Sequence, residues 1–151
     1  MKKNLTLDYI RGLIEGEATF TFCTSTSGKE KVRIPAFQLR MHIRDKNLIE
    51  GVRDFLNLKN KVYVYHYPGK DGSKRGPQAM LIVRELGNLK NKIVPLCYDQ
   101  LVGYKATQFN NWLDDIGNNK DVPNSYKIIY FLHKNGFYRK NPTYLDIFVK
   151  Q

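Results

Sequence analysis

The stretch from Leu7 to Ala18 constrains the fold most, because it reads as a helix that ends on a carboxylate and continues directly into a strand. Thr6 is a suitable N-cap residue, and Asp8 places negative charge in the first turn. Apolar residues recur at the three- and four-residue spacing of one helix face: Leu7, Ile10, Leu13 and Ile14. With no loop before the following strand, such a helix holds Glu17 at one fixed point.

Two glycines, Gly12 and Gly16, lie four residues apart in this helix and therefore on one side of it. Each costs about 1 kcal/mol relative to alanine in a helix interior. The usual compensation is the close approach of another backbone, here most simply a second helix. The sequence therefore predicts a tight helix pair with Gly12, Leu13 and Gly16 in the interface and acids at its end.

The nine residues from Ile10 to Ala18 resemble the sequence motif of the LAGLIDADG homing endonucleases. Five positions fit the motif: Gly12, Leu13, Ile14, Gly16 and Glu17. Arg11 stands where the family has a small residue, and Ala18 where it has a glycine. The resemblance implies that Glu17 is the metal-binding catalytic acid, with Gly16 beside it as a second metal contact.

Two further stretches extend the resemblance over about residues 7–112. In the segment from Lys92 to Phe109, Lys105 matches a family lysine that approaches the scissile phosphate. The segment from Ala36 to His42 is similar to the family's second strand. Some relatives have a water-orienting glutamine near the position of Met41, so Gln38 or His42 is left as its substitute.

Charge favours the same class of partner without reference to the motif. The chain of 151 residues has 25 Lys and Arg against 14 Asp and Glu, a formal net charge of +11. Such a surplus favours a polyanion such as DNA or RNA. No apolar run approaches the roughly 18 residues of a membrane-spanning helix, and the N-terminus does not resemble a secretory signal. We expect an intracellular protein, in a bacterial or archaeal cytoplasm or in an organelle, that is not secreted and has no membrane partner.

The two cysteines and three histidines are scattered without metal-ligand spacing, so a zinc site or a disulfide framework is not expected. Any metal would be held by carboxylate and other oxygen atoms. Such ligands suit Mg²⁺ or another hard divalent cation.

Hydrophobic periodicity predicts an α+β fold with elements in the order αββαββα. The family resemblance implies that the strands form a four-stranded antiparallel, saddle-shaped sheet with helices on one of its faces. The expected strands cover residues 19–27, 32–41, 61–67 and 78–84, and the expected helices 7–18, 47–56, 89–96 and 107–116. We expect a single domain over residues 1–151, with a core at about 7–116 and a helical extension at about 122–151. The run from Ala79 to Val83 is apolar on both faces and gives no orientation.

Polar and aromatic residues that face away from the predicted core would form a nucleic-acid surface. The residues expected to reach base edges are Thr21, Ser25, Arg33, Gln38, Arg40, His42, Tyr63 and Tyr65. Lysines around them would neutralise phosphates, among them Lys61, Lys70 and Lys74. The alternating tyrosines are equally compatible with simple packing.

The resulting prediction is a site-specific double-strand DNA endonuclease that acts as a homodimer on a nearly palindromic site, with Glu17, Lys105 and Gln38 as catalytic residues. The alternative is a maturase-like RNA-splicing cofactor or a non-cleaving DNA-binding regulator on the same scaffold, which adds intron RNA as a partner to be tested. Glu17 could also be a solvated acid and Lys105 a surface charge. Glu15 is better explained as a solvated or capping acid than as a metal ligand.

Overall fold

Helix α1 (Leu7–Glu17) runs directly into strand β1 (Ala18–Ser27), as the sequence predicts. The computed structural model describes residues 4–68 and 74–149. The Thr6 hydroxyl accepts a hydrogen bond from the Tyr9 backbone N–H at 3.1 Å, which confirms the predicted N-cap.

The remaining elements follow the predicted order, with ends that shift by a few residues. The sheet and its second helix comprise β2 (Glu30–His42), α2 (Lys46–Phe55), β3 (Val62–Pro68) and β4 (Lys74–Val83). A helical segment follows as α3 (Leu86–Asn88), a π-helical turn (Leu89–Ile93) and α4 (Val94–Cys97). The last helices are α5 (Tyr104–Asn118), α6 (Lys127–Lys134) and α7 (Phe137–Lys140). Short 3₁₀ turns cover η1 (Ile43–Asp45), η3 (Asn124–Tyr126) and η4 (Tyr144–Ile147).

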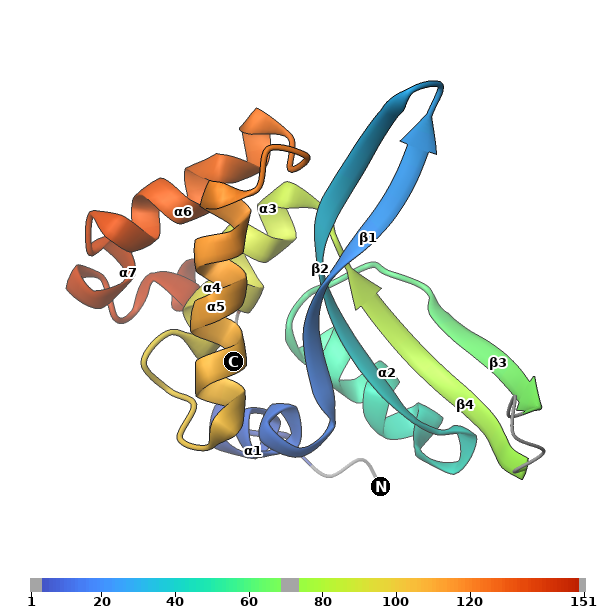
Figure 1. Cartoon of the computed structure of the whole chain (residues 1–151). Coiled ribbons are helices and arrows are strands. Elements are labelled where there is room, and N and C mark those ends of the chain that lie inside the picture. Colours follow the sequence, from blue (N-terminus) through green and yellow to red (C-terminus); the bar gives the residue numbers. More distant parts are fainter. Residues whose placement is uncertain (1–3, 69–73, 150–151) are drawn as a thin grey trace.

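The four strands form one antiparallel sheet in the order β1-β2-β4-β3. Figure 1 shows the long β1–β2 hairpin extending past the helices, with α1, α5 and α6 gathered to one side of the sheet. The register orients β4, which the sequence alone could not. Ala79, Leu81 and Val83 face the helices, whereas Met80 and Ile82 share the opposite face with Arg40 and Gln38. We call this opposite face the outward face.

The core between sheet and helices is built around an aromatic cluster. The ring of Phe20 lies 5.7 Å from that of Phe37, 5.0 Å from that of Phe109 and 5.3 Å from that of Trp112. The indole N–H of Trp112 also donates to the Thr21 carbonyl at 2.8 Å. Since β1 is an edge strand, this bond satisfies part of its open edge and fixes α5 against it.

The C-terminal segments close the other side of the same core. Ile129, Tyr138, Leu145 and Val149 are buried within it. The region after α5 is therefore packed on the domain. No helix in the described ranges has the length and hydropathy needed to cross a bilayer.

Candidate functional site

The end of α1 presents a single exposed carboxylate. Glu17 is the last helical residue, and no hydrogen bond or ion pair to its carboxylate is found among the described residues. The chain leaves the helix through Ala18, which is buried and extended at φ −88°, ψ 160°. The carbonyls of the last helical turn, including that of Gly16, lack the usual intrahelical partners. Hard oxygen atoms are therefore concentrated at this point.

Lys105 reaches the same point from the first turn of α5. Its Nζ donates to the Ala18 carbonyl at 2.5 Å, one residue beyond Glu17. The side chain is half-buried, so the ammonium group is held by its surroundings rather than free in solvent. The fold thus brings together the acid and the lysine that the family resemblance selected from distant parts of the sequence.

Glu15 has a structural partner, in agreement with its expected capping role. Its carboxylate accepts hydrogen bonds from the backbone N–H groups of Val102 and Gly103, and Gly103 is the N-cap residue of α5. A carboxylate at a helix N-terminus satisfies otherwise unpaired N–H groups and interacts favourably with the helix dipole. Glu15 therefore ties α1 to the start of α5, which places Lys105.

The glycine face of α1 is uncovered. A Cβ atom added to Gly12 or to Gly16 would meet no other atom within 4 Å, and both residues are exposed. Tyr9, three residues before Gly12, is 51% exposed, whereas Leu13 is half-buried against the core of its own chain. The sequence prediction did not include Tyr9 among the residues of the helix-pair interface, although its spacing from Gly12 places it on the same face of α1.

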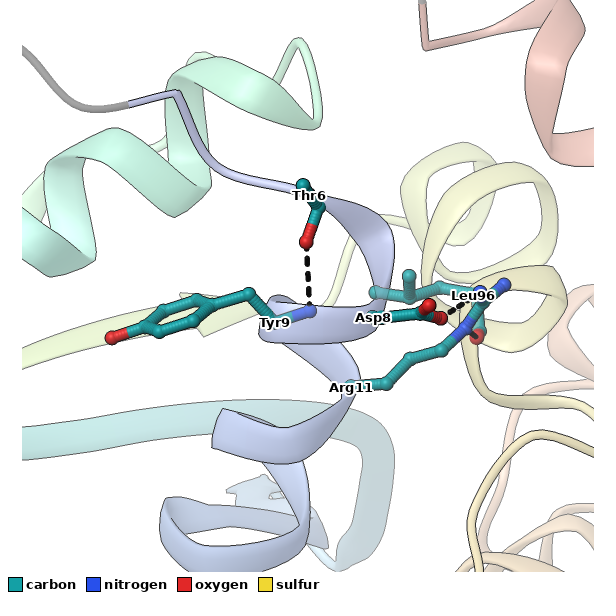
Figure 2. A network of polar contacts seen from close by, with 5 residues as sticks. All are labelled: Thr6, Asp8, Tyr9, Arg11 and Leu96. Carbon is teal, nitrogen blue, oxygen red and sulfur yellow. Dashed lines mark hydrogen bonds and ion pairs between the residues drawn. The ribbon is translucent and has the colours of Figure 1, made fainter.

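Arg11 is turned away from this face. Figure 2 shows Tyr9 and Arg11 projecting to opposite sides of α1. The guanidinium Nε donates to the Leu96 carbonyl in α4 at 2.8 Å, and Nη1 lies 3.7 Å from an Asp8 carboxylate oxygen. The large residue in the motif therefore contacts its own chain.

The outward face of the sheet carries most of the residues predicted to read bases. Gln38 pairs in register with Thr19 on β1, two residues after Glu17, and with Ile82 on β4. The others on this face are Thr21, Ser25, Arg40, His42, Tyr63 and Tyr65. Their shared face confirms the predicted alternation, while base reading itself stays a prediction.

Arg33 is the exception, and its predicted placement was wrong. Position 33 has the same strand parity as Phe37 and Leu39, so its side chain lies on the helix side of the sheet. The guanidinium stacks 4.4 Å from the ring centroid of Phe22, on the same side. The cation covers an aromatic ring there, and the Arg33 backbone N–H donates to the Asp121 carbonyl at 3.0 Å.

A basic recess of about 570 Å³ lies at the end of the outward face beside the start of β3. Lys59, Lys61, Arg84 and Lys92 line it, with Glu85 as its acid. The Lys61 ammonium lies 5.3 Å from the Tyr63 ring centroid, and Lys92 Nζ donates to the Asn57 carbonyl at 2.7 Å. Burial lowers the pKa of Lys92.

Of the other lysines predicted to contact phosphate, Lys70 lies outside the described residues, and only the backbone of Lys74, in β4, is described. Within the described ranges, no group of three or more His, Cys, Asp or Glu side chains is placed to hold a metal ion. One copy of the chain thus supplies a single acid at the end of α1.

The fold is that of the LAGLIDADG homing endonucleases. A structure of the meganuclease I-SmaMI bound to uncleavable DNA superposes with a TM-score of 0.63 at 19% identity, over 98% of this chain and 44% of that one. The LAGLIDADG homing endonuclease I-LtrWI bound to target DNA gives a TM-score of 0.62 at 24% identity, over 97% and 45%. The homing endonuclease I-TnaI gives 0.61 at 19% identity, over 93% and 82%.

This chain therefore spans less than half the length of I-SmaMI and I-LtrWI. No family model and no curated protein matches the sequence.

Proposed function

We propose that the chain is a site-specific double-strand DNA endonuclease that acts as a homodimer on a nearly palindromic target and uses a carboxylate-bound divalent cation, Mg²⁺ in the simplest case. The observation that carries the proposal is the hydrogen bond from Lys105 to the Ala18 carbonyl, one residue beyond the exposed Glu17, at the end of a helix whose glycine face is open. The neighbours named above are described as meganucleases or homing endonucleases, two of them with DNA bound.

The open face of α1 supports a second copy as the partner. Two α1 helices can approach closely across Gly12 and Gly16, because no side chain intervenes there. An isologous two-fold contact brings each residue near its own equivalent, so the two Glu17 carboxylates would lie together at the helix ends. The doubled length of I-SmaMI and I-LtrWI is consistent with this arrangement, since a second copy would supply the matching half.

The residues at the helix end fit a hard divalent cation. Two Glu17 carboxylates and the last-turn carbonyls of Gly16 are oxygen ligands, which such cations prefer. Adjacent carboxylates also repel one another unless a cation lies between them. A bound divalent cation lowers the pKa of an attacking water and stabilises negative charge on the phosphate.

The other side chains have roles that follow from their positions. Lys105, held at the Ala18 carbonyl, places its positive charge where a phosphate beside Glu17 would lie, and stabilises the charge that develops there. Gln38 lies beside Thr19 on the outward face, and in this proposal its amide hydrogen-bonds a water near that phosphate.

The outward face supplies recognition in this proposal. Strands can enter the major groove, where Arg40 would favour guanine and Gln38 adenine. The lysines and Arg84 of the basic recess would contact phosphates and fix the position of the duplex without reading its sequence. Two sheets related by the two-fold axis would require a nearly symmetric site.

The test is a Glu17→Gln variant of the full chain, assayed on a target selected from a randomised duplex library in Mg²⁺. The amide keeps the shape but removes the charge that holds the cation, so cleavage should fall by orders of magnitude while DNA binding persists. Lys105→Met should slow cleavage less, and Lys120→Met, at an exposed position after α5, should leave it unchanged. Cleavage by Glu17→Gln at a near wild-type rate would show that the active site lies elsewhere.

A further inference from the structure

The neutral imidazole of His42 is held in one tautomer by the backbone that follows it. His42 ends β2 and is the N-cap residue of the 3₁₀ turn η1, where its Nδ1 accepts a hydrogen bond from the Arg44 backbone N–H at 3.1 Å. A nitrogen that accepts a hydrogen bond carries no proton, so the proton of the neutral ring is on Nε2. His42 therefore presents a donor, not an acceptor, at its far edge.

A glycine on the neighbouring strand lies beside the Nε2 edge of the ring and has no side chain to cover it. The register pairs His42 with Gln78, and Gly76 lies two residues away on the same face of β4. A Cβ atom on Gly76 would come within 3.2 Å of Nε2, and the backbone there has φ +67°, which side chains rarely adopt. No acceptor for Nε2 is found in the part of the chain that the structure describes. Among the described residues this N–H has no partner, and a ligand could supply the acceptor.

We infer that His42 is a specificity-determining residue that contacts one base of each half-site through Nε2–H and excludes cytosine at that base. The inference rests on the proposed function, because it needs the outward face to lie in the major groove. There, guanine, adenine and thymine each offer an acceptor atom, whereas cytosine offers only its amino donor. A donor fixed by the η1 turn cannot reverse its polarity to accept from that amino group.

Two substitutions distinguish the role of Nδ1, which caps the η1 turn, from that of Nε2, which would contact the base. Asparagine can accept the Arg44 N–H through its side-chain oxygen, as in other turns of this kind, but it is too short to replace Nε2. Glutamine reaches as far as Nε2 and can turn either its donor or its acceptor to the base. The variants are therefore His42→Asn, which keeps the cap, and His42→Gln, which keeps the reach. Gln38→Ala serves as the control on the same strand.

The experiment is selection of bound sites from a randomised DNA duplex library with the full chain, followed by sequencing. Wild type should deplete cytosine roughly 3- to 10-fold at one symmetry-related pair of positions, the worth of one neutral hydrogen bond. Both His42 variants should lose this depletion, and His42→Gln should recover cytosine-containing sites. Gln38→Ala should change preference at another position and leave the depletion in place.

Two outcomes would count against the inference in different ways. If wild type selects a defined site but His42→Asn shows the same base preferences at every position, His42 does not read a base. If wild type enriches no site at all, the proposed function fails, and the inference fails with it.

Discussion

Replacement by alanine should lower the stability of the protein at Glu15 but not at Glu17, although the two acids lie two residues apart at the end of α1. Glu15 accepts from the N–H groups of Val102 and Gly103 at the start of α5. Loss of an N-terminal capping group with favourable charge–dipole interaction costs about 1–2 kcal/mol. Because no described group pairs with the carboxylate of Glu17, its removal should not lower the free energy of unfolding.

Urea unfolding monitored by tryptophan fluorescence measures this difference well, because Trp112 is the only tryptophan and is buried between α5 and β1. The measurement belongs in EDTA at one protein concentration, since a dimer's stability depends on both. Glu15→Ala should also lower the thermal midpoint by roughly 2–8 °C for a chain of this size. Glu15→Gln keeps an acceptor oxygen and should lose less.

The cleavage activities of the same variants should not follow their stabilities. Glu17→Ala should abolish cleavage without a loss of stability, whereas Glu15→Ala should retain part of the cleavage activity at temperatures where the variant remains folded. Equal destabilisation by the two alanine variants, or an unchanged midpoint for Glu15→Ala, would refute the division of the two acids into a capping residue and a metal ligand.

Three further predictions test other parts of the molecule. Arg40→Ala should weaken DNA binding by roughly 1–3 kcal/mol at particular base pairs, whereas Arg33→Ala, on the helix side of the sheet, should leave base preference unchanged in the same binding assay. Gly12→Leu should prevent dimer formation in sedimentation experiments, and a variant that still sediments as the wild type does would exclude the proposed axis. Burial lowers the pKa of His133, so its contribution to stability should be fully present above the ordinary histidine pKa near 6.5 and should be lost as the pH falls below that value. His133→Gln should reduce the loss of stability between pH 7.5 and 5.5, and an unchanged pH dependence in this variant would contradict the prediction.

The strand faces were predictable where apolar and polar residues alternate. On β2, Phe37 and Leu39 point to the core and Gln38 and Arg40 away from it, because a strand places successive side chains on opposite faces. The same parity assigns Arg33 to the core side. A basic side chain was expected outside, but the guanidinium of Arg33 lies on the helix side, where it stacks over the ring of Phe22.

Strand β4 could not be oriented from sequence because apolar residues occupy both of its faces. Met80 is only 7% exposed on the outward face. The register places it between Arg40 and Tyr63, whose long side chains flank it on the neighbouring strands. Met80 is therefore buried by the side chains beside it on the outward face, and its burial does not show which face of the sheet packs on the core.

The contacts that assemble the site could not be derived from local patterns. The bond from Lys105 to the Ala18 carbonyl joins residues far apart in the chain, as do those from Val102 and Gly103 to Glu15. Periodicity predicts elements but not which loop meets which helix end. Lys105 was selected only through the family resemblance. For Glu15, capping was only one of the two roles that the sequence suggested.

The two departures from the family motif are accommodated by the backbone and by the direction of one side chain. A glycine at the end of α1 would be required only by a positive φ or a crowded Cβ, and Ala18 has the extended values that any residue adopts. Arg11 would obstruct a partner helix only if it lay on the Gly12 side, but it donates to the Leu96 carbonyl on the other. A second α1 can therefore approach Gly12 and Gly16 with both residues unchanged, so reverting them to the motif should not be needed for dimer formation.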